Sequence, residues 1–148
     1  MSRDLQSNLY LLCRVGSTDL AFPAENIEAV VRVGSVVPTP GAPPCVRGLA
    51  AIRSRLLTLI DSAVVVGEAA GDPAFMAIIT IDGHGYGLLL DAIEDVVALP
   101  PSEPLPALVS AGWQALSPQL VDHAGRLLLL IEPAQFIARA TQYSSLAA

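Results

Sequence analysis

The 148-residue chain has no lysine: all eight of its basic residues are arginines, and with 14 acidic residues the formal net charge is −6. The arginines are spread along the chain, at positions 3, 14, 32, 47, 53, 55, 126 and 139. Proteins that bind phosphate backbones or anionic lipids present a cluster of basic side chains. The sequence therefore predicts neither a nucleic-acid partner nor binding to an acidic membrane surface.

Long apolar runs are also missing, although 53% of the residues are hydrophobic. The longest runs, such as Leu127–Ile131 and Ala63–Val66, are strand-sized and far shorter than the roughly 18 residues of a membrane span. The first eight residues contain no apolar stretch of the kind found in a signal peptide. We therefore expect no direct membrane insertion and a cytoplasmic location, with the apolar excess buried in a core or in a partner interface.

Chemically reactive residues are few. The two histidines, His84 and His123, lie far apart without cysteines or carboxylates at ligand spacing, so no metal site is expected. The two cysteines, Cys13 and Cys45, are expected to be reduced thiols, and Cys45 has no nearby base that would activate it. The glycine-rich segment 83–87 lacks the lysine of a phosphate-binding loop, and no Gly-x-Ser-x-Gly motif occurs. The sequence thus predicts a protein that is not an enzyme and carries no cofactor.

The chain does contain an internal repeat. Arg55–Asp61 (RLLTLID) recurs as Arg126–Glu132 (RLLLLIE), 71 positions later (126 − 55). Three earlier segments recur at a spacing of 66 positions: 10–15 as 76–81, 20–22 as 86–88, and 27–31 as 93–97. Two copies are too few for a solenoid, so the repeat predicts a pseudo-twofold β protein. The alternative is chance similarity among aliphatic strands.

Local patterns predict many short strands. They cover residues 9–15, 20–22, 27–33, a hairpin over 48–61 that reverses at Ser54, 75–81, 86–90, 93–99, 120–122 and 126–131. A short helix is expected to begin at Asp61 or Ser62. A closing helix is expected from Glu132 to Ala140, with Phe136, Ile137 and Ala140 on one face. Short strands separated by glycine and proline turns are typical of a small barrel or sandwich.

Arg53 is the charged residue with the most suggestive position, at the point where one strand of the 48–61 hairpin ends. A turn arginine is usually just a solvated charge. Alternatively, its planar guanidinium binds a neighbouring loop carbonyl or the carboxylate of a partner, which lysine does less well. The residue pattern leaves both interpretations open.

The order of these motifs resembles the CheW-like domain family, the adaptors of bacterial chemotaxis arrays. The resemblance runs from about Leu9 to Ile137. In the first half it rests on Gly16, Leu20, Ile27–Val30, Pro43–Gly48, Arg53 and Asp61. In the second half it rests on Gly87–Val97 and Arg126–Glu132.

The resemblance implies a mostly β fold of two interleaved SH3-like five-stranded β-barrels, related by the internal duplication and sharing an apolar core. One domain would span residues 1–148, with about 9–66 and 74–137 as its halves and strands exchanged between them. Family members do not catalyse reactions. They bind the regulatory domain of the histidine kinase CheA through the first barrel and the helical tip of chemoreceptors in the groove between the barrels. The resemblance also implies a cytoplasmic location, at receptor arrays on the inner membrane.

We expect partner binding on apolar strand surface around Val30, Val31 and the 38–46 loop, oriented by Arg53. The full set of expected partner-binding residues is Arg53, Val30, Val31, Glu28, Pro43, Val46, Asp61, Asp91 and Asp95.

The chain departs from the family pattern mainly in its first half, at Ala29, Ala51, Ser54 and Thr58, where the family has Glu, Asn, Gly and Pro. Ser54 in place of glycine means that a positive φ is either not required or is held with strain. The departures keep two alternatives open. One is a diverged module that serves a non-chemotaxis kinase or another adaptor, or that competes within arrays. The other is a β-barrel that binds an apolar ligand.

Overall fold

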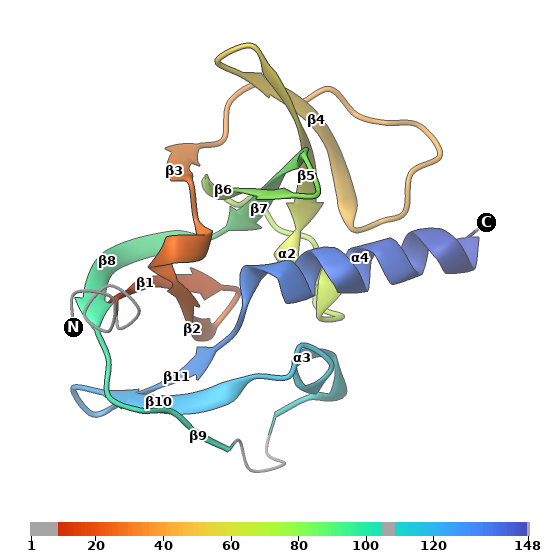
Figure 1. Cartoon of the computed structure of the whole chain (residues 1–148). Coiled ribbons are helices and arrows are strands. Elements are labelled where there is room, and N and C mark those ends of the chain that lie inside the picture. The colour runs from red at the N-terminus through yellow and green to blue at the C-terminus, as the bar shows by residue number, and fades with distance from the viewer. Residues whose placement is uncertain (1–8, 105–108, 148) are drawn as a thin grey trace.

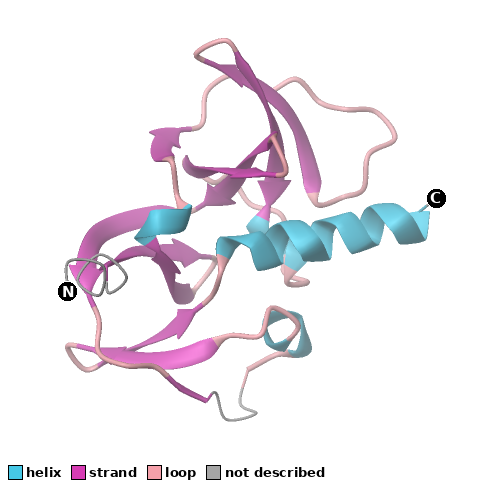
Figure 2. Ribbon diagram, viewed as in Figure 1, coloured by secondary structure: helices cyan, strands magenta, loops and turns pink. Residues whose placement is uncertain are grey.

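The computed structural model describes residues 9–104 and 109–147. Strands dominate the described chain, and the helices are few (Figures 1 and 2). The strands are β1 (Leu9–Val15), β2 (Thr18–Pro23), β3 (Ala29–Arg32), β4 (Val46–Ile52), β5 (Arg55–Asp61), β6 (Phe75–Ile81), β7 (His84–Leu90), β8 (Ala92–Ala98), β9 (Glu103–Pro104), β10 (Gln119–His123) and β11 (Arg126–Leu130). The helices are the 3-10 helix η1 (Ala24–Asn26), α2 (Ser62–Val65), α3 (Ala111–Gln114) and α4 (Pro133–Ala147).

The strands form two sheets that exchange strands between the two halves of the chain. The six-stranded sheet has the order β8-β1-β2-β11-β10-β9, and the five-stranded sheet has the order β3-β6-β7-β5-β4. The third strand of each half, β3 or β8, therefore pairs with the first strand of the other half. Each sheet also contains one parallel pair, β5 with β7 or β11 with β2. The predicted mostly β fold of interleaved, duplicated units is confirmed, and α4 runs between the two sheets in the view of Figure 2.

The apolar core consists of three clusters, one shared by the two sheets and one belonging to each sheet. A central cluster includes the side chains of Phe22, Leu88 and Phe136 and lies between the sheets. Each sheet also has its own smaller cluster. Leu57 in one of these clusters and Leu128 in the other are the same position of the repeat, 71 residues apart. Equivalent positions therefore bury equivalent side chains, which chance similarity among strands would not produce.

Tight two-residue turns join the hairpins. Asp82-Gly83 and Ala124-Gly125 both have positive φ at each position, as a type I′ turn requires. The β4–β5 turn has the same form, with φ of 49° at Arg53 and 66° at Ser54. A left-handed backbone costs roughly 1–2 kcal/mol per non-glycine residue. Positive φ is thus kept at Ser54, and it is held with strain.

The helix caps follow the sequence prediction in part. Asp61 is the N-cap of α2, and its Oδ1 accepts a hydrogen bond from the Val64 backbone N–H at 3.3 Å. Pro133 is the first residue of α4, which is longer than predicted and ends at Ala147. Phe136 and Ile137 are buried, as the predicted helix face requires.

Some element bounds differ from the prediction. Strand β3 is shorter than the predicted 27–33 because the chain is still leaving η1 at Ile27. The short strand β9 was not predicted in the proline-rich stretch, where it pairs with β10 through only two residues. None of the helices in the described residues is long and apolar enough to cross a membrane.

Candidate partner-binding site

The strongest candidate site is a recess of about 170 Å³ on the five-stranded sheet, between the edge strand β3 and the β4–β5 hairpin. It brings together three of the residues expected to bind a partner, Glu28, Val31 and Arg53. Its other lining residues are Ala29, Ile52, Arg55, Leu57 and Ile78. Most of this lining is apolar and is continuous with the core cluster of the sheet. The recess can therefore accept an apolar side chain beside a charged rim.

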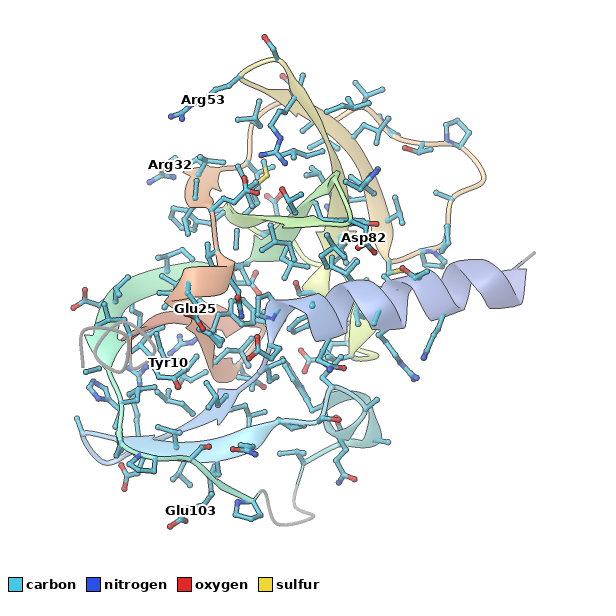
Figure 3. All side chains as sticks on the ribbon, viewed as in Figure 1. Tyr10, Glu25, Arg32, Arg53, Asp82 and Glu103 are labelled. Atoms are coloured by element: carbon cyan, nitrogen blue, oxygen red, sulfur yellow. The ribbon has the colours of Figure 1, made fainter. Side chains whose placement is uncertain are left out.

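Arg53 supplies the free charge of this rim. Its side chain extends from the tip of the β4–β5 hairpin away from the sheet (Figure 3). Within residues 9–104 and 109–147, no carboxylate lies within ion-pair distance of the Arg53 guanidinium. A guanidinium in this position can accept a carboxylate in a two-pronged hydrogen bond. The structure thus leaves Arg53 available to an anionic group.

The other charges of the recess compensate each other. Arg55 Nη1 donates to Glu28 Oε2 at 2.6 Å, and Arg55 Nη2 donates to Thr80 Oγ1 at 2.7 Å. The Thr80 hydroxyl in turn donates to Glu28 Oε1. The hydrogen bond from Thr80 and, next, that from Arg55 lower the pKa of Glu28 from its ordinary value of 4.5. Glu28 is therefore ionised and already paired at neutral pH.

The remaining apolar residues expected at the interface lie outside the recess. Val30 points to the opposite face of β3 and packs against the central cluster. Pro43 is half-buried in the loop before β4, and its carbonyl accepts a hydrogen bond from the Val46 N–H at 2.9 Å. Val46 lines a separate pocket with Tyr86 and α4. The nine expected residues thus do not form one continuous surface.

The three expected aspartates interact within the chain. The Asp61 side chain is 3% exposed, and its Oδ2 lies 2.5 Å from Arg47 Nη2. Asp91 Oδ2 accepts a hydrogen bond from the Gly16 N–H at 2.6 Å, which holds the β1–β2 turn. Asp95 is exposed and accepts a hydrogen bond from the next backbone N–H of β8. Asp61 and Asp91 have visible structural roles, and partner binding by all three aspartates stays a prediction.

His84 and the two cysteines each have defined surroundings in the structure. His84 Nε2 lies 2.9 Å from Thr58 Oγ1, and its ring lies 4.6 Å from that of Tyr86. Cys13 and Cys45 are buried, and burial raises the pKa of both thiols, which keeps them protonated. Across the part of the chain that the structure describes, no three His, Cys, Asp or Glu side chains gather to hold a metal ion.

Comparison with known proteins identifies the family of the chain. The family model of the CheW-like domain matches residues 9–141. The chain belongs to the CheW-like domain family. The crystal structure of the scaffolding protein TtCheW from Thermoanaerobacter tengcongensis aligns with a TM-score of 0.75 over 86% of this CheW-like chain and 85% of that chain. The sequence identity in that alignment is 17%, so the likeness shows a shared fold.

Curated relatives support the same assignment of this CheW-like chain. The chemotaxis protein CheW of Rhizobium meliloti is 23% identical over 124 residues, which are 80% of each chain. The chemotaxis protein CheW of Thermotoga maritima is 25% identical over 124 residues, or 82% of each chain. Protein FrzA of Myxococcus xanthus is 28% identical over 96 residues, which cover 63% of this chain and 60% of that protein.

Sequence reasoning missed Arg55 as a residue of the site of this CheW-like chain. Its side chain lines the recess and pairs with Glu28. The signal was present in the repeat, because Arg126 stands at the same position of the second copy. The sequence could not show which carboxylate each arginine reaches, since that depends on the order of strands in the sheets.

Proposed function

We propose that this CheW-like chain is a non-enzymatic scaffold that couples chemoreceptors to a CheA-type histidine kinase in bacterial chemotaxis signalling. The observation that carries the proposal is the recess beside β3, which combines an apolar floor with the free guanidinium of Arg53. Membership of the CheW-like family supports the choice of the kinase regulatory domain as the proposed partner of this surface. The proposed place of action is the cytoplasm, at receptor arrays on the inner membrane.

The kinase domain is proposed to insert an apolar side chain between Val31 and Leu57 and to place a carboxylate against Arg53. Apolar anchors in fitted pockets contribute most of the affinity of small interfaces. The charge of Arg53 on the rim adds orientation and specificity. An affinity near micromolar, about −8 kcal/mol, is expected for a complex that must assemble and exchange.

The receptor tip is proposed to bind where the two sheets meet. Support for this proposal comes from the central cluster, which extends to the partly buried side chains of Ile27, Val30 and Ile93. Ile27 and Ile93 are equivalent positions of the repeat, 66 residues apart. They would present a symmetric pair of apolar contacts to a helical hairpin.

Calorimetric titration with the regulatory domain of a CheA-type kinase from the same cell tests the proposal. Wild-type protein should bind near micromolar, Arg53→Ala should weaken binding, and Arg53→Lys should restore only part of it because an ammonium cannot form the paired hydrogen bond. Arg32→Ala is the matched control, since Arg32 is an exposed cation of the same sheet whose guanidinium lies 5.1 Å from the Phe75 ring. Equal affinity for wild type and Arg53→Ala, with both proteins folded, would show that Arg53 has no role in binding.

A second candidate function is a diverged module for a different kinase or a competitor within arrays. Ala29 favours it, because this residue lines the recess at the position where the family has a glutamate. Without that carboxylate the recess holds two arginines and one glutamate, which suits a more acidic partner. A reconstituted receptor array distinguishes the two functions. A coupling scaffold raises kinase activity in the array, whereas a competitor lowers the activity supported by an authentic coupling protein.

A further inference from the structure

The Arg55 side chain crosses two strands of the five-stranded sheet. Arg55 is the first residue of β5, and its guanidinium passes over Gly85 of β7 to reach Thr80 of β6 and Glu28 just before β3. A Cβ atom at Gly85 would lie 2.8 Å from Arg55 Nη2 and 2.6 Å from Leu57 Cδ2. The absence of a side chain at Gly85 therefore leaves room for this path. The interaction, called here the Arg55 clamp and defined by Arg55, Glu28 and Thr80, joins elements that are not neighbours in the sheet.

The six-stranded sheet contains an equivalent arginine–glutamate contact at equivalent positions of the repeat. Arg126, the first residue of β11, donates from Nη2 to Glu94 of β8 at 3.0 Å. Its Nε also lies 3.6 Å from Asp19 of β2, which accepts a hydrogen bond from Arg14 of β1 at 3.0 Å. Arg126 and Glu94 correspond to Arg55 and Glu28 through the two offsets of the repeat. In both halves of the chain, an arginine at the start of the last strand therefore pairs with a glutamate at or just before the third strand of the same half.

Only the Arg55 clamp borders the candidate partner site. Both Arg55 and Glu28 line the recess, together with Arg53. We propose that Arg55 is a positioning residue of this site: it fixes the start of the edge strand β3 and neutralises Glu28, so that Arg53 selects an acidic, apolar segment of the partner. This inference rests on the proposed function and assigns the electrostatic specificity of the same surface.

The effect of Arg55 on partner binding can be separated from its effect on the stability of the fold. The Arg55 and Glu28 side chains are 44% and 43% exposed, and exposed ion pairs contribute little to global stability. Removing Arg55 would leave the Glu28 carboxylate uncompensated within the same recess as Arg53. That carboxylate would compete for Arg53 and repel an acidic partner. The loss should therefore appear in partner binding and hardly at all in unfolding.

The test measures binding of the CheA-type kinase regulatory domain to four variants. Arg55→Gln should weaken binding about fivefold, the size expected for an exposed charge interaction. Glu28→Gln in the same chain as Arg55→Gln should restore part of the affinity, because the repelling charge is gone although the contact that holds β3 is still missing. Glu28→Gln alone should bind more tightly than Arg55→Gln, because no carboxylate then competes for Arg53. The matched control, Arg126→Gln, removes the equivalent clamp from the other sheet and should leave binding unchanged.

The proposal is overturned if Arg55→Gln and Arg126→Gln have equal effects, or if the double variant is as weak as Arg55→Gln. Hydrogen exchange of β3 distinguishes this failure from failure of the proposed function. If wild-type protein does not bind the kinase domain, the proposed function is wrong. The positioning role of the clamp is then tested by the hydrogen-exchange rates of the Glu28 and Val33 amides. These amides donate hydrogen bonds to the Ile78 and Ala74 carbonyls at 2.8 and 2.9 Å. Arg55→Gln should speed their exchange relative to Arg126→Gln, and equal rates would contradict the positioning role.

Discussion

Replacing Asp61 with alanine should destabilise the fold without touching the binding recess. The Asp61 carboxylate is 3% exposed, pairs with Arg47 at 2.5 Å and caps α2 through the Val64 N–H. Arg47 is 33% exposed and also donates to the Gly71 carbonyl at 3.0 Å. Removal of Asp61 therefore leaves a cation that can be rehydrated, rather than an isolated buried charge.

The expected magnitude follows from two lost interactions. An N-cap contributes about 0.5–2 kcal/mol, and a hydrogen bond to a charged group about 1.5–3 kcal/mol. Because Arg47 regains water, we expect Asp61→Ala to cost about 2–4 kcal/mol, or roughly 4–16 °C in Tm for a chain of this length. Arg47→Ala should cost more, about 3–5 kcal/mol, since it leaves the Asp61 carboxylate buried without its partner. The double variant should be no less stable than Arg47→Ala.

Urea denaturation with linear extrapolation measures these differences. Asp95→Ala removes an exposed carboxylate and serves as the control, with an expected change within about 0.5 kcal/mol. If Asp61→Ala also falls within that range, the structural role derived from its burial is wrong.

Three further predictions concern the core, the thiols and Glu28. Leu57→Ala and Leu128→Ala should each cost about 2–5 kcal/mol in urea denaturation, because both side chains are buried at equivalent positions; a large difference between them would contradict equivalent packing. Both cysteines should resist a thiol-specific disulfide reagent at pH 8 and react at once in urea, since burial raises their pKa; fast labelling of the native protein would show an accessible thiolate. The lowered pKa of Glu28 means that its stabilising effect is complete above pH 4.5 and is lost as the pH falls through the folded-state value. NMR titration should show this pKa moving back toward 4.5 in Thr80→Val.

Much of the fold could be predicted because the repeat and the turn residues are local signals. The strand Arg55–Asp61 and its copy Arg126–Glu132 were recognised from their order of residues alone, and the structure has strands at both places. The reversal of the 48–61 hairpin at Ser54 was predicted from the sequence, and the structure has a tight turn at Arg53-Ser54. The destination of each strand is not a local property, so the exchange of β3 and β8 came only from the family resemblance. Strand β9 could not be predicted because two residues carry no periodicity.

A residue of the site could be predicted from the sequence only where its role follows from its place in one local element, and not where it depends on how distant strands pair. Arg53 was singled out because it ends a strand, and the structure places it at an exposed hairpin tip. Asp61 was expected at an interface, but its contact with Arg47 depends on the bulged pairing of β4 with β5. Arg55 was missed because its partners Glu28 and Thr80 are brought to it by the parallel pairing of β5 with β7 and by the neighbouring strands.

The exchange of strands also sets the order of events during synthesis on the ribosome. The β1–β2 hairpin is made first, yet its neighbours in the sheet are β8 and β11. Strand β11 begins at Arg126, about 100 residues after the hairpin ends, so at about 5–20 residues per second it emerges roughly 5–20 s later. Both edges of the hairpin are open to other chains until β8 emerges, and the β2 edge stays open until β11 emerges. The nascent chain is therefore more exposed to strand pairing with other chains than a chain whose halves fold one after the other.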